Sequence, residues 1–325
     1  MKICIYGAGV IGGVLAGSLL KAGHEVCAIA RGAQLEALRD KGLTIITPAA
    51  TATYQLPVSA SPADFGPQDL VIITTKTPAL DDVAKSIAPL LGPQTMVGFS
   101  VNGVFWFYGD GFAPGGTKID VSRLDPNGTL HREIGAERAL GIVVWSGGEI
   151  REPGVIRASR AGGRIAIGPA LPQNAARSRA LIEAMNITDL TVDIADDVRV
   201  PMWEKFITVS GVFGLCALTG ATIGQIHADP ETQAVMLAVQ GEADRIARAH
   251  GITDTKFNAE QLRANPVASP HKPSMLQDLE RGRRMEIEST YLVLQDLARQ
   301  AGIATPALDV VAPLLAMRAR VAGCY

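Results

Sequence analysis

A glycine-rich turn near the start of the chain constrains its fold more than any other feature. The turn follows a strand-like run at residues 3–6 and opens a helix-like run at residues 10–22. In this context the first glycine permits a tight turn, the second lets the backbone approach a ligand, and the third lets helix and strand pack closely. The helix N-terminus then faces an anion. The turn therefore predicts a dinucleotide-binding α/β domain with six cofactor-binding residues, which are Gly7, Ala8, Gly9, Val10, Ile11 and Gly12.

The first hundred residues continue this alternation of strand and helix. Short β-branched runs separate helical patterns, which is typical of βαβ units around a parallel sheet. We expect strands at 25–30, 70–75 and 95–99, and helices at 33–41 and 80–91. The N-terminal part is therefore predicted to be a Rossmann-type, doubly wound domain.

The remaining sequence divides into a mixed part and a helical part. Residues 106–138 are rich in turn residues and predict long loops or hairpins. Strands and one helix are then expected at 142–145, 154–158, 164–167, 175–185 and 190–194. After Ala195 only helical patterns remain, at 201–218, 232–250, 275–300 and 305–320. The sequence thus predicts a dinucleotide-binding domain at 1–195 and an all-α domain at 196–325.

The composition argues against nucleic acid and membrane as partners. Hydrophobic residues make up 47% of the chain and the formal net charge is -2, so neither disorder nor a surface for polyanions is expected. The longest uncharged apolar stretch, residues 206–223, is interrupted by glycine, serine and threonine. That pattern favours a buried helix over a membrane span.

The N-terminal sequence and the cysteines indicate a cytoplasmic protein. The start MKICIYGAGV lacks the succession of a basic region, a long apolar segment and a cleavage site. The four cysteines show neither close pairing nor metal-type spacing, so we expect them to be reduced. The five histidines have no metal-ligand spacing either, and we expect no metal.

The residue after the second predicted strand indicates which dinucleotide is bound. An acidic residue about 20 positions past the glycine turn usually binds the ribose hydroxyl of NAD. No such residue is present here, and Arg31 stands at this point instead. A guanidinium can bind a 2′-phosphate with two hydrogen bonds. We therefore expect NADPH, with an ordinary solvated arginine as the alternative.

Two polar residues follow strands of the predicted sheet. Lys76 comes directly after the buried run at 70–75, and Asn102 follows the run at 95–99. Ligands of open α/β sheets collect outside the carboxyl ends of the strands. Both residues are therefore candidates for cofactor binding, although a lysine at a strand end is often only a surface charge.

The helical half contributes a candidate catalytic pair. Lys205 and Glu286 each lie on a largely apolar face of a predicted helix. Burying either charge alone is costly, so each needs a partner or a wet cavity. The alternative is that Lys205 reaches solvent or pairs with Glu204, and that Glu286 pairs with Arg283.

These residues together resemble the ketopantoate reductase family, NADPH-dependent enzymes that reduce 2-dehydropantoate to pantoate on the route to coenzyme A. The resemblance covers nearly the whole chain. It rests on the glycine turn with Arg31, on Lys76, on Asn102-Gly103, on Trp203-Glu204-Lys205, and on the block SMLQDLERGRRMEIE that begins at Ser274 and includes Glu286.

The resemblance implies a role for each of these side chains. Lys205 would be the general acid that protonates the developing alkoxide, and Glu286 would position that ammonium or the substrate hydroxyl. Asn102 and Lys76 would lie near the nicotinamide and its ribose. Ser274 would bind the substrate carboxylate or hydroxyl. A fixed cation aimed at the developing oxyanion stabilises the transition state more than the ground state.

The substrate side departs from the family pattern. Family asparagines that bind pantoate-type substrates correspond here to Val209, Phe213 and His271. We count these three, with Asn102 and Ser274, as substrate-binding positions. A site that lacks amide partners no longer rejects substrates that lack the matching groups. The stretch after Asn102 is also longer than in compact members and is expected to bring aromatic residues toward a cleft, namely Trp106, Phe107 and Tyr108.

The sequence therefore predicts NADPH-dependent reduction of a small-molecule 2-oxo acid, with 2-dehydropantoate as the best guess. One alternative is a paralogous reductase for a different, more apolar oxo acid. Another is a non-catalytic NADPH-binding regulatory protein. A homodimer would bury apolar surface of the helical half, but the sequence does not fix the oligomeric state. The reductase interpretation expects Lys205 and Glu286 to meet beside the reactive end of the dinucleotide.

Overall fold

The computed structural model describes residues 1–111, 119–159 and 162–325, and chain contacts divide it into two compact units. The first unit comprises Met1–Val101 and Asn127–Val198, and the second comprises Asn102–Pro126 and Arg199–Tyr325. This division differs from a single cut after residue 195 because the segment Asn102–Pro126 belongs with the C-terminal helices. Each unit is described by itself below.

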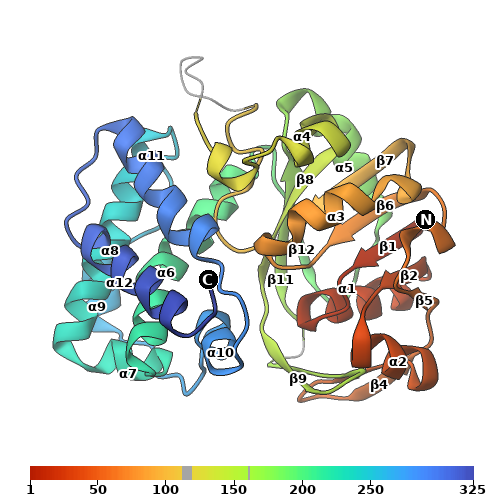
Figure 1. Cartoon of the computed structure of the whole chain (residues 1–325), viewed down its shortest axis with the longest axis horizontal. Helices are drawn as coiled ribbons and strands as arrows, with labels where there is room; N and C mark the ends of the chain where they lie inside the picture. Colours follow the sequence, from red (N-terminus) through yellow and green to blue (C-terminus); the bar gives the residue numbers. More distant parts are fainter. Residues whose placement is uncertain (112–118, 160–161) are drawn as a thin grey trace. The chain divides into compact units, whose positions relative to one another are not determined.

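The first unit is built on one large, mainly parallel sheet (Figure 1). Only the β8–β11 pair among its neighbours is antiparallel in the described residues. The spatial order is β12 (Thr191–Ile194), β11 (Arg164–Pro169), β8 (Ala139–Trp145), β7 (Leu91–Phe99), β6 (Gln68–Ile73), β1 (Lys2–Tyr6), β2 (Glu25–Ile29) and β5 (Val58–Ser59). The helices of this unit are α1 (Val10–Lys21), α2 (Gly32–Lys41), α3 (Leu80–Ser86), α4 (Thr129–Glu133) and α5 (Ala175–Ala184). The predicted α/β class is confirmed.

Helix α1 is packed between the large sheet and a second, smaller sheet. A Cβ added to Gly13 would lie 2.1 Å from Ile156, and one added to Gly17 would lie 2.4 Å from Ile45. Both isoleucines belong to the small sheet, so the helix needs its small residues on this side. The small sheet was not predicted, and its order is β4 (Thr51–Tyr54), β3 (Leu43–Ile46), β10 (Val155–Ala158) and β9 (Gly148–Glu152).

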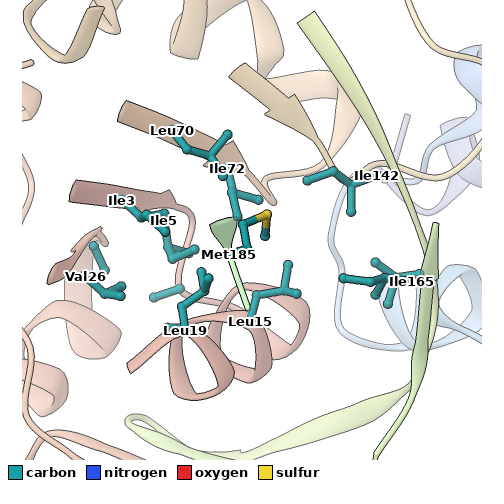
Figure 2. Packing of buried hydrophobic residues seen from close by; sticks show 14 of the residues in the cluster. Ile3, Ile5, Leu15, Leu19, Val26, Leu70, Ile72, Ile142, Ile165 and Met185 are labelled. Carbon is teal, nitrogen blue, oxygen red and sulfur yellow. The ribbon is translucent and has the colours of Figure 1, made fainter. Parts of the chain in front are cut away.

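The core of the first unit lies on the opposite side of α1. Figure 2 shows Leu15 and Leu19 pointing from this helix toward Ile5 and Ile72 of the central strands. All four side chains are at most 1% exposed. Burying one such side chain contributes about 1.5–3 kcal/mol, so this contact holds the helix and its glycine turn firmly on β1.

The second unit is helical (Figure 1). At its centre, α6 (Arg199–Thr219) contacts four of the other α-helices and the π-helix, which explains why its long apolar stretch is buried. Within the described residues, none of the helices combines the length and apolarity that crossing a membrane requires. The other elements are α7 (Ile223–Ala228), α8 (Pro230–Ala249), α9 (Ala259–Ala264), α10 (Ser274–Glu280), a π-helix (Glu288–Leu292), α11 (Val293–Ala301) and α12 (Leu308–Val321).

The single helix predicted at 275–300 is wrong, because the chain leaves the helix at Gly282. This glycine has a φ of +63°, a left-handed conformation that ends helices readily. The Arg283 amide then donates to the Asp278 carbonyl over 2.8 Å, which completes a helix-ending turn. Glu286 therefore lies in a non-helical segment between α10 and the π-helix, and not on a continuous apolar helix face.

The aromatic residues after Asn102 do not line an open cleft. Trp106, Phe107 and Tyr108 are each at most 3% exposed. The Trp203 indole of α6 donates a 2.9 Å hydrogen bond to the Tyr108 hydroxyl, and the two rings meet edge to face. These residues form core of the second unit. Part of the predicted loop region, residues 112–118, lies outside the described residues.

Candidate active site

The glycine turn has the geometry that its sequence predicts. Gly7 follows β1, and its amide donates to the Ile29 carbonyl over 3.0 Å, which ties the turn to the end of β2. A Cβ on Gly12 would lie 2.2 Å from the Gly7 carbonyl oxygen, so this position must be glycine. A Cβ on Gly9 would meet nothing within 4 Å, and Gly9 begins α1 without a side-chain cap. The amides at the start of α1 are therefore approachable from this open side.

Two threonines at the end of β6 complete the turn. Thr74 Oγ1 donates a short hydrogen bond to the Gly7 carbonyl. Thr75 lies beside Gly7, and its Oγ1 is buried without a hydrogen-bond partner in the described structure. A buried hydroxyl without a partner costs free energy, and a ligand polar atom at the turn would relieve that cost. These features fit a bound pyrophosphate.

Arg31 stands just past β2 and is exposed at the start of α2. Further along α2, the Gln34 side-chain amide donates to the Ala8 carbonyl over 2.8 Å, which fixes this helix against the glycine turn. Lys76 follows β6 and is half-buried. The sequence analysis missed Gln34 and Thr75. Thr75 lay inside the strand predicted at 70–75, and only the observed end of β6 at Ile73 makes it a residue that follows the strand.

Asn102, Lys205 and Glu286 form a hydrogen-bonded chain within the second unit. Lys205 Nζ donates to Asn102 Oδ1 over 2.9 Å, and Asn102 Nδ2 donates to Glu286 Oε2 over 3.1 Å. The amide thus accepts from the cation and donates to the carboxylate. Lys205 comes from α6, Asn102 from the start of the second unit, and Glu286 from the segment before the π-helix.

Burial lowers the pKa of the Lys205 ammonium. Loss of solvent lowers the pKa of Lys205 to about 8, while the negative charge of Glu286 acts in the opposite direction. Glu286 is only 7% exposed. Neighbouring Glu204 lies 3.6 Å from Lys256 Nζ, so the carboxylate next in sequence to Lys205 faces another lysine. An ammonium with a pKa near neutrality is suited to proton transfer.

The backbone around Gly103 holds Asn102 against the π-helix. The Val104 amide donates to the Ser289 carbonyl over 2.9 Å. Gly103 has a φ of +87°, and a Cβ there would lie 1.9 Å from that carbonyl oxygen. Single-turn π-helices occur frequently at functional sites. Here the π-helix gives Asn102 and Glu286 a shared support.

Tyr291 of the π-helix joins this support to α6, the helix that carries Lys205. The buried hydroxyl of Tyr291 accepts from the Gly214 amide over 2.6 Å and donates to the Ser210 carbonyl over 2.9 Å. A Cβ on Gly214 would lie 2.4 Å from that hydroxyl, so the close approach depends on glycine. The three segments that carry Lys205, Asn102 and Glu286 are thus fixed to one another through backbone contacts.

The predicted substrate-binding residues differ in how far they are exposed to solvent. Ser274 is half-buried at the first position of α10. Val209 is 3% exposed on α6, and Phe213 one turn later is half-buried. His271 is exposed, and its carbonyl accepts from the Ile223 amide over 3.1 Å. The structure does not gather these four side chains with Asn102 in any described contact.

The described residues contain no group of three or more histidine, cysteine, aspartate or glutamate side chains arranged to hold a metal ion. All four cysteines are buried and free.

Comparison with known families decides the assignment. A family model described as "Ketopantoate reductase PanE/ApbA" matches residues 3–109, and one described as "Ketopantoate reductase PanE/ApbA C terminal" matches residues 197–319. The chain belongs to the ketopantoate reductase family. The resemblance seen in the sequence is confirmed, and the family is one of oxidoreductases.

Individual proteins and solved structures match this chain over nearly their whole length. A 2-dehydropantoate 2-reductase of Mesorhizobium japonicum is 36% identical over 328 residues, covering 100% of both chains. The crystal structure of a 2-dehydropantoate 2-reductase from Geobacter metallireducens has a TM-score of 0.83 at 26% identity, covering 98% of this chain and 99% of that one. A D-mandelate dehydrogenase solved with NADH and anilino(oxo)acetate has a TM-score of 0.84 at 18% identity, covering 100% of both, which is a likeness of fold alone.

Proposed function

We propose that this protein reduces a 2-oxo acid to a 2-hydroxy acid with NADPH, and that 2-dehydropantoate, the precursor of pantoate in coenzyme A biosynthesis, is its substrate. The observation that carries the proposal is the hydrogen-bonded chain Lys205–Asn102–Glu286, which presents a cation of lowered pKa. The relatives named as 2-dehydropantoate 2-reductases support the choice of substrate.

The geometry of the chain suits a carbonyl reduction. Bound NADPH would supply the hydride. Lys205 would stabilise the negative charge that develops on the carbonyl oxygen and then donate its proton to that oxygen. Asn102 holds the ammonium in place with its amide oxygen, and Glu286 holds the amide in the orientation that this requires. Because the amide is fixed before substrate binds, little reorganisation is needed at the moment of reaction.

The first unit contains the residues that would hold the nucleotide. The amides that begin α1 at Gly9 would bind the pyrophosphate, and Thr75 Oγ1 would gain the partner that it lacks. Arg31 would bind the 2′-phosphate that distinguishes NADPH from NADH. Lys76 would lie near the ribose. The meeting of Lys205 with the reactive end of the nucleotide stays a prediction.

Turnover by the purified protein tests this function. NADPH should be oxidised when 2-dehydropantoate is added, and Lys205→Ala should lower kcat by about 100- to 10,000-fold because the proton donor is lost. Lys85→Ala, at an exposed lysine paired with Asp81, serves as the control and should keep its activity. Full turnover by Lys205→Ala would exclude the mechanism. Tight NADPH binding without turnover of any oxo acid would favour a regulatory protein.

A different, more apolar oxo acid is the second candidate. Val209 and Phe213 replace amides of the family pattern, and Phe213 is half-buried on the helix of Lys205. A wall with fewer hydrogen-bond partners discriminates less against apolar substrates. Comparing kcat/KM across a panel of 2-oxo acids with aliphatic and aromatic side chains distinguishes the candidates. A clear preference for 2-dehydropantoate would dismiss this one.

We also propose a homodimer formed through α12. Four apolar side chains on this helix are more than half exposed, in the order Val310 58%, Leu314 54%, Met317 56% and Val321 76%. Their spacing of four, three and four residues reads the same in both directions, which suits a twofold antiparallel contact with a second copy. Asp309 lies at one end of the helix and Arg318 near the other. An antiparallel pairing would therefore bring opposite charges together.

A further inference from the structure

Residues 281–286, which lead from α10 to the π-helix, form a turn and then a segment without regular secondary structure that includes Glu286. A segment of this kind does not fix a side chain by helix geometry alone. Something else must hold Glu286 at hydrogen-bond distance from Asn102, because catalytic groups work only when they are held within a fraction of an ångström.

The backbone just before Glu286 is bound to the residues that follow α12. The Met285 amide donates to the Cys324 carbonyl over 2.7 Å. Arg284 Nε donates to the main-chain oxygen of Tyr325 over 3.0 Å. Two successive residues of the segment are thus tied to two successive residues after the helix, which fixes both the position and the direction of the chain that enters Glu286.

The residues that provide this anchor are themselves fixed. The Cys324 amide donates to the Ala319 carbonyl over 2.8 Å at the end of α12, and Cys324 is fully buried. The Tyr325 ring lies 4.7 Å from the Arg320 guanidinium, in the position of a cation–π contact. The anchor is therefore part of the packed end of α12 and not a loose tail.

The Tyr325 side chain also reaches past Glu286 to the first residue of the π-helix. Its hydroxyl donates a short hydrogen bond to Glu288 Oε1. Arg123 Nη1 donates to the other oxygen, Glu288 Oε2, over 2.9 Å. Tyr325 thus contacts the chain on both sides of Glu286, at Arg284 before it and at Glu288 after it.

We propose that Cys324 and Tyr325 are positioning residues for the active site: they hold Glu286 where its carboxylate can orient the Asn102 amide toward Lys205. The assignment of the three side chains to catalysis rests on the proposed function. The contact of Cys324 and Tyr325 with the segment before Glu286 does not depend on the proposed function, so it can be tested without substrate.

Titration of the Lys205 ammonium by NMR of lysine-labelled protein tests the proposal directly. Lys205→Arg identifies the signal. Glu286→Gln removes the negative charge that raises the pKa of Lys205, so its titration should move to lower pH. Tyr325→Ala removes the hydrogen bond to Glu288 and the ring contact with Arg320. Glu286 should then move away from Asn102, and the Lys205 titration should shift in the same direction. Tyr325→Phe keeps the ring against Arg320 and loses only the bond to Glu288, so its shift should be smaller.

Arg263→Ala, at an exposed arginine of α9, is the control and should leave the titration unchanged. A folded Tyr325→Ala protein with the wild-type titration would overturn the proposal. Should Tyr325→Ala fail to fold, Arg284→Ala removes the bond to the main-chain oxygen of Tyr325 and must produce the same downward shift. An unchanged titration in that variant would overturn it equally.

Turnover separates this proposal from the proposed function. If the protein is the reductase, Tyr325→Ala should lower kcat about 10-fold or more and change the KM for NADPH little. In the Glu286→Gln background the same substitution should have little further effect on kcat, because both act through one carboxylate. A shifted titration in a protein that reduces no oxo acid would uphold the positioning role and refute the reductase.

Discussion

Lys205 Nζ and Asn102 Oδ1 are joined by a 2.9 Å hydrogen bond, so the lysine that carries the candidate proton is held by a neutral amide. The same amide donates to Glu286 and cannot flip without losing both bonds. A direct ion pair would hold a lysine proton more tightly. The Asn102 amide fixes the position of the Lys205 ammonium, and the Glu286 carboxylate influences the lysine pKa without contacting it directly.

Removing the Asn102 side chain should break the hydrogen-bonded chain that joins Lys205 to Glu286. Asn102→Ala leaves Lys205 without its acceptor and Glu286 without its donor, so we expect kcat to fall about 10- to 100-fold. The KM for NADPH should change less. Asn265→Ala, at an exposed amide of the same unit, is the control. Steady-state kinetics on both variants decide, and a wild-type kcat for Asn102→Ala would contradict the relay.

The pH dependence of kcat should report the lysine. Lys205 must be protonated to donate, and burial lowers its pKa to about 8. Activity should therefore be level below this pH and fall about 10-fold per pH unit above it. Glu286→Gln should move this limb to lower pH, because the carboxylate raises the pKa of Lys205. A limb that moves upward would be the wrong sign.

Gly103 should tolerate no side chain. Its positive φ opposes alanine, and so does the Ser289 carbonyl oxygen, which would lie 1.9 Å from an added Cβ. We expect Gly103→Ala to lower the free energy of unfolding by at least about 2 kcal/mol. Gly282→Ala shares the positive φ but would meet nothing within 4 Å, so it isolates the cost of backbone strain. Denaturant unfolding should show the larger loss at Gly103, and equal losses would argue against the carbonyl contact.

Arg31 should set the preference between nucleotides. Arg31→Ala removes a charged partner of the proposed 2′-phosphate, and a hydrogen bond to a charged group contributes about 1.5–3 kcal/mol. The KM for NADPH should rise by about 10- to 100-fold on that basis, with little change for NADH. Arg39→Ala on α2 controls for the loss of positive charge. Equal effects on both nucleotides would remove Arg31 from phosphate recognition.

A charge in the middle of the α12 stripe should prevent association of two copies. Leu314→Glu places a charge against Met317 of the second copy in the antiparallel pairing and buries it in the apolar contact, which is unfavourable. Sedimentation should then show a monomer where the wild type is a dimer. Val267→Glu, at an exposed valine of the same unit, should leave the wild-type state intact. A monomeric wild-type protein at micromolar concentration would refute the proposed contact.

The parts of the fold that follow local rules were predictable from sequence. Strand β1 and helix α1 were expected at 3–6 and 10–22 and lie at Lys2–Tyr6 and Val10–Lys21, because turn chemistry and periodicity agree there. The small sheet was missed. Its strands Leu43–Ile46 and Val155–Ala158 are short and pair although they lie far apart in the sequence, so neither shows its partner in its own pattern.

The candidate site shows the same contrast. Lys205, Asn102 and Glu286 were selected from the sequence, but Glu286 was placed on a helix that the backbone of Gly282 interrupts. A pattern of apolar spacing does not reveal a left-handed residue that ends a helix. The bond that anchors Met285 to Cys324 was invisible for another reason: it joins two main-chain atoms, whose hydrogen bonds leave no trace in side-chain identity.

The glycines of α1 serve two different neighbours at once. Gly12 admits the carbonyl of the turn, whereas Gly13 and Gly17 admit side chains of the small sheet. A substituent on any of them would displace the helix and carry its positive end with it. The thermal stability of the first unit and its affinity for an anion thus depend on the same glycines, so a change that alters one of these properties also alters the other.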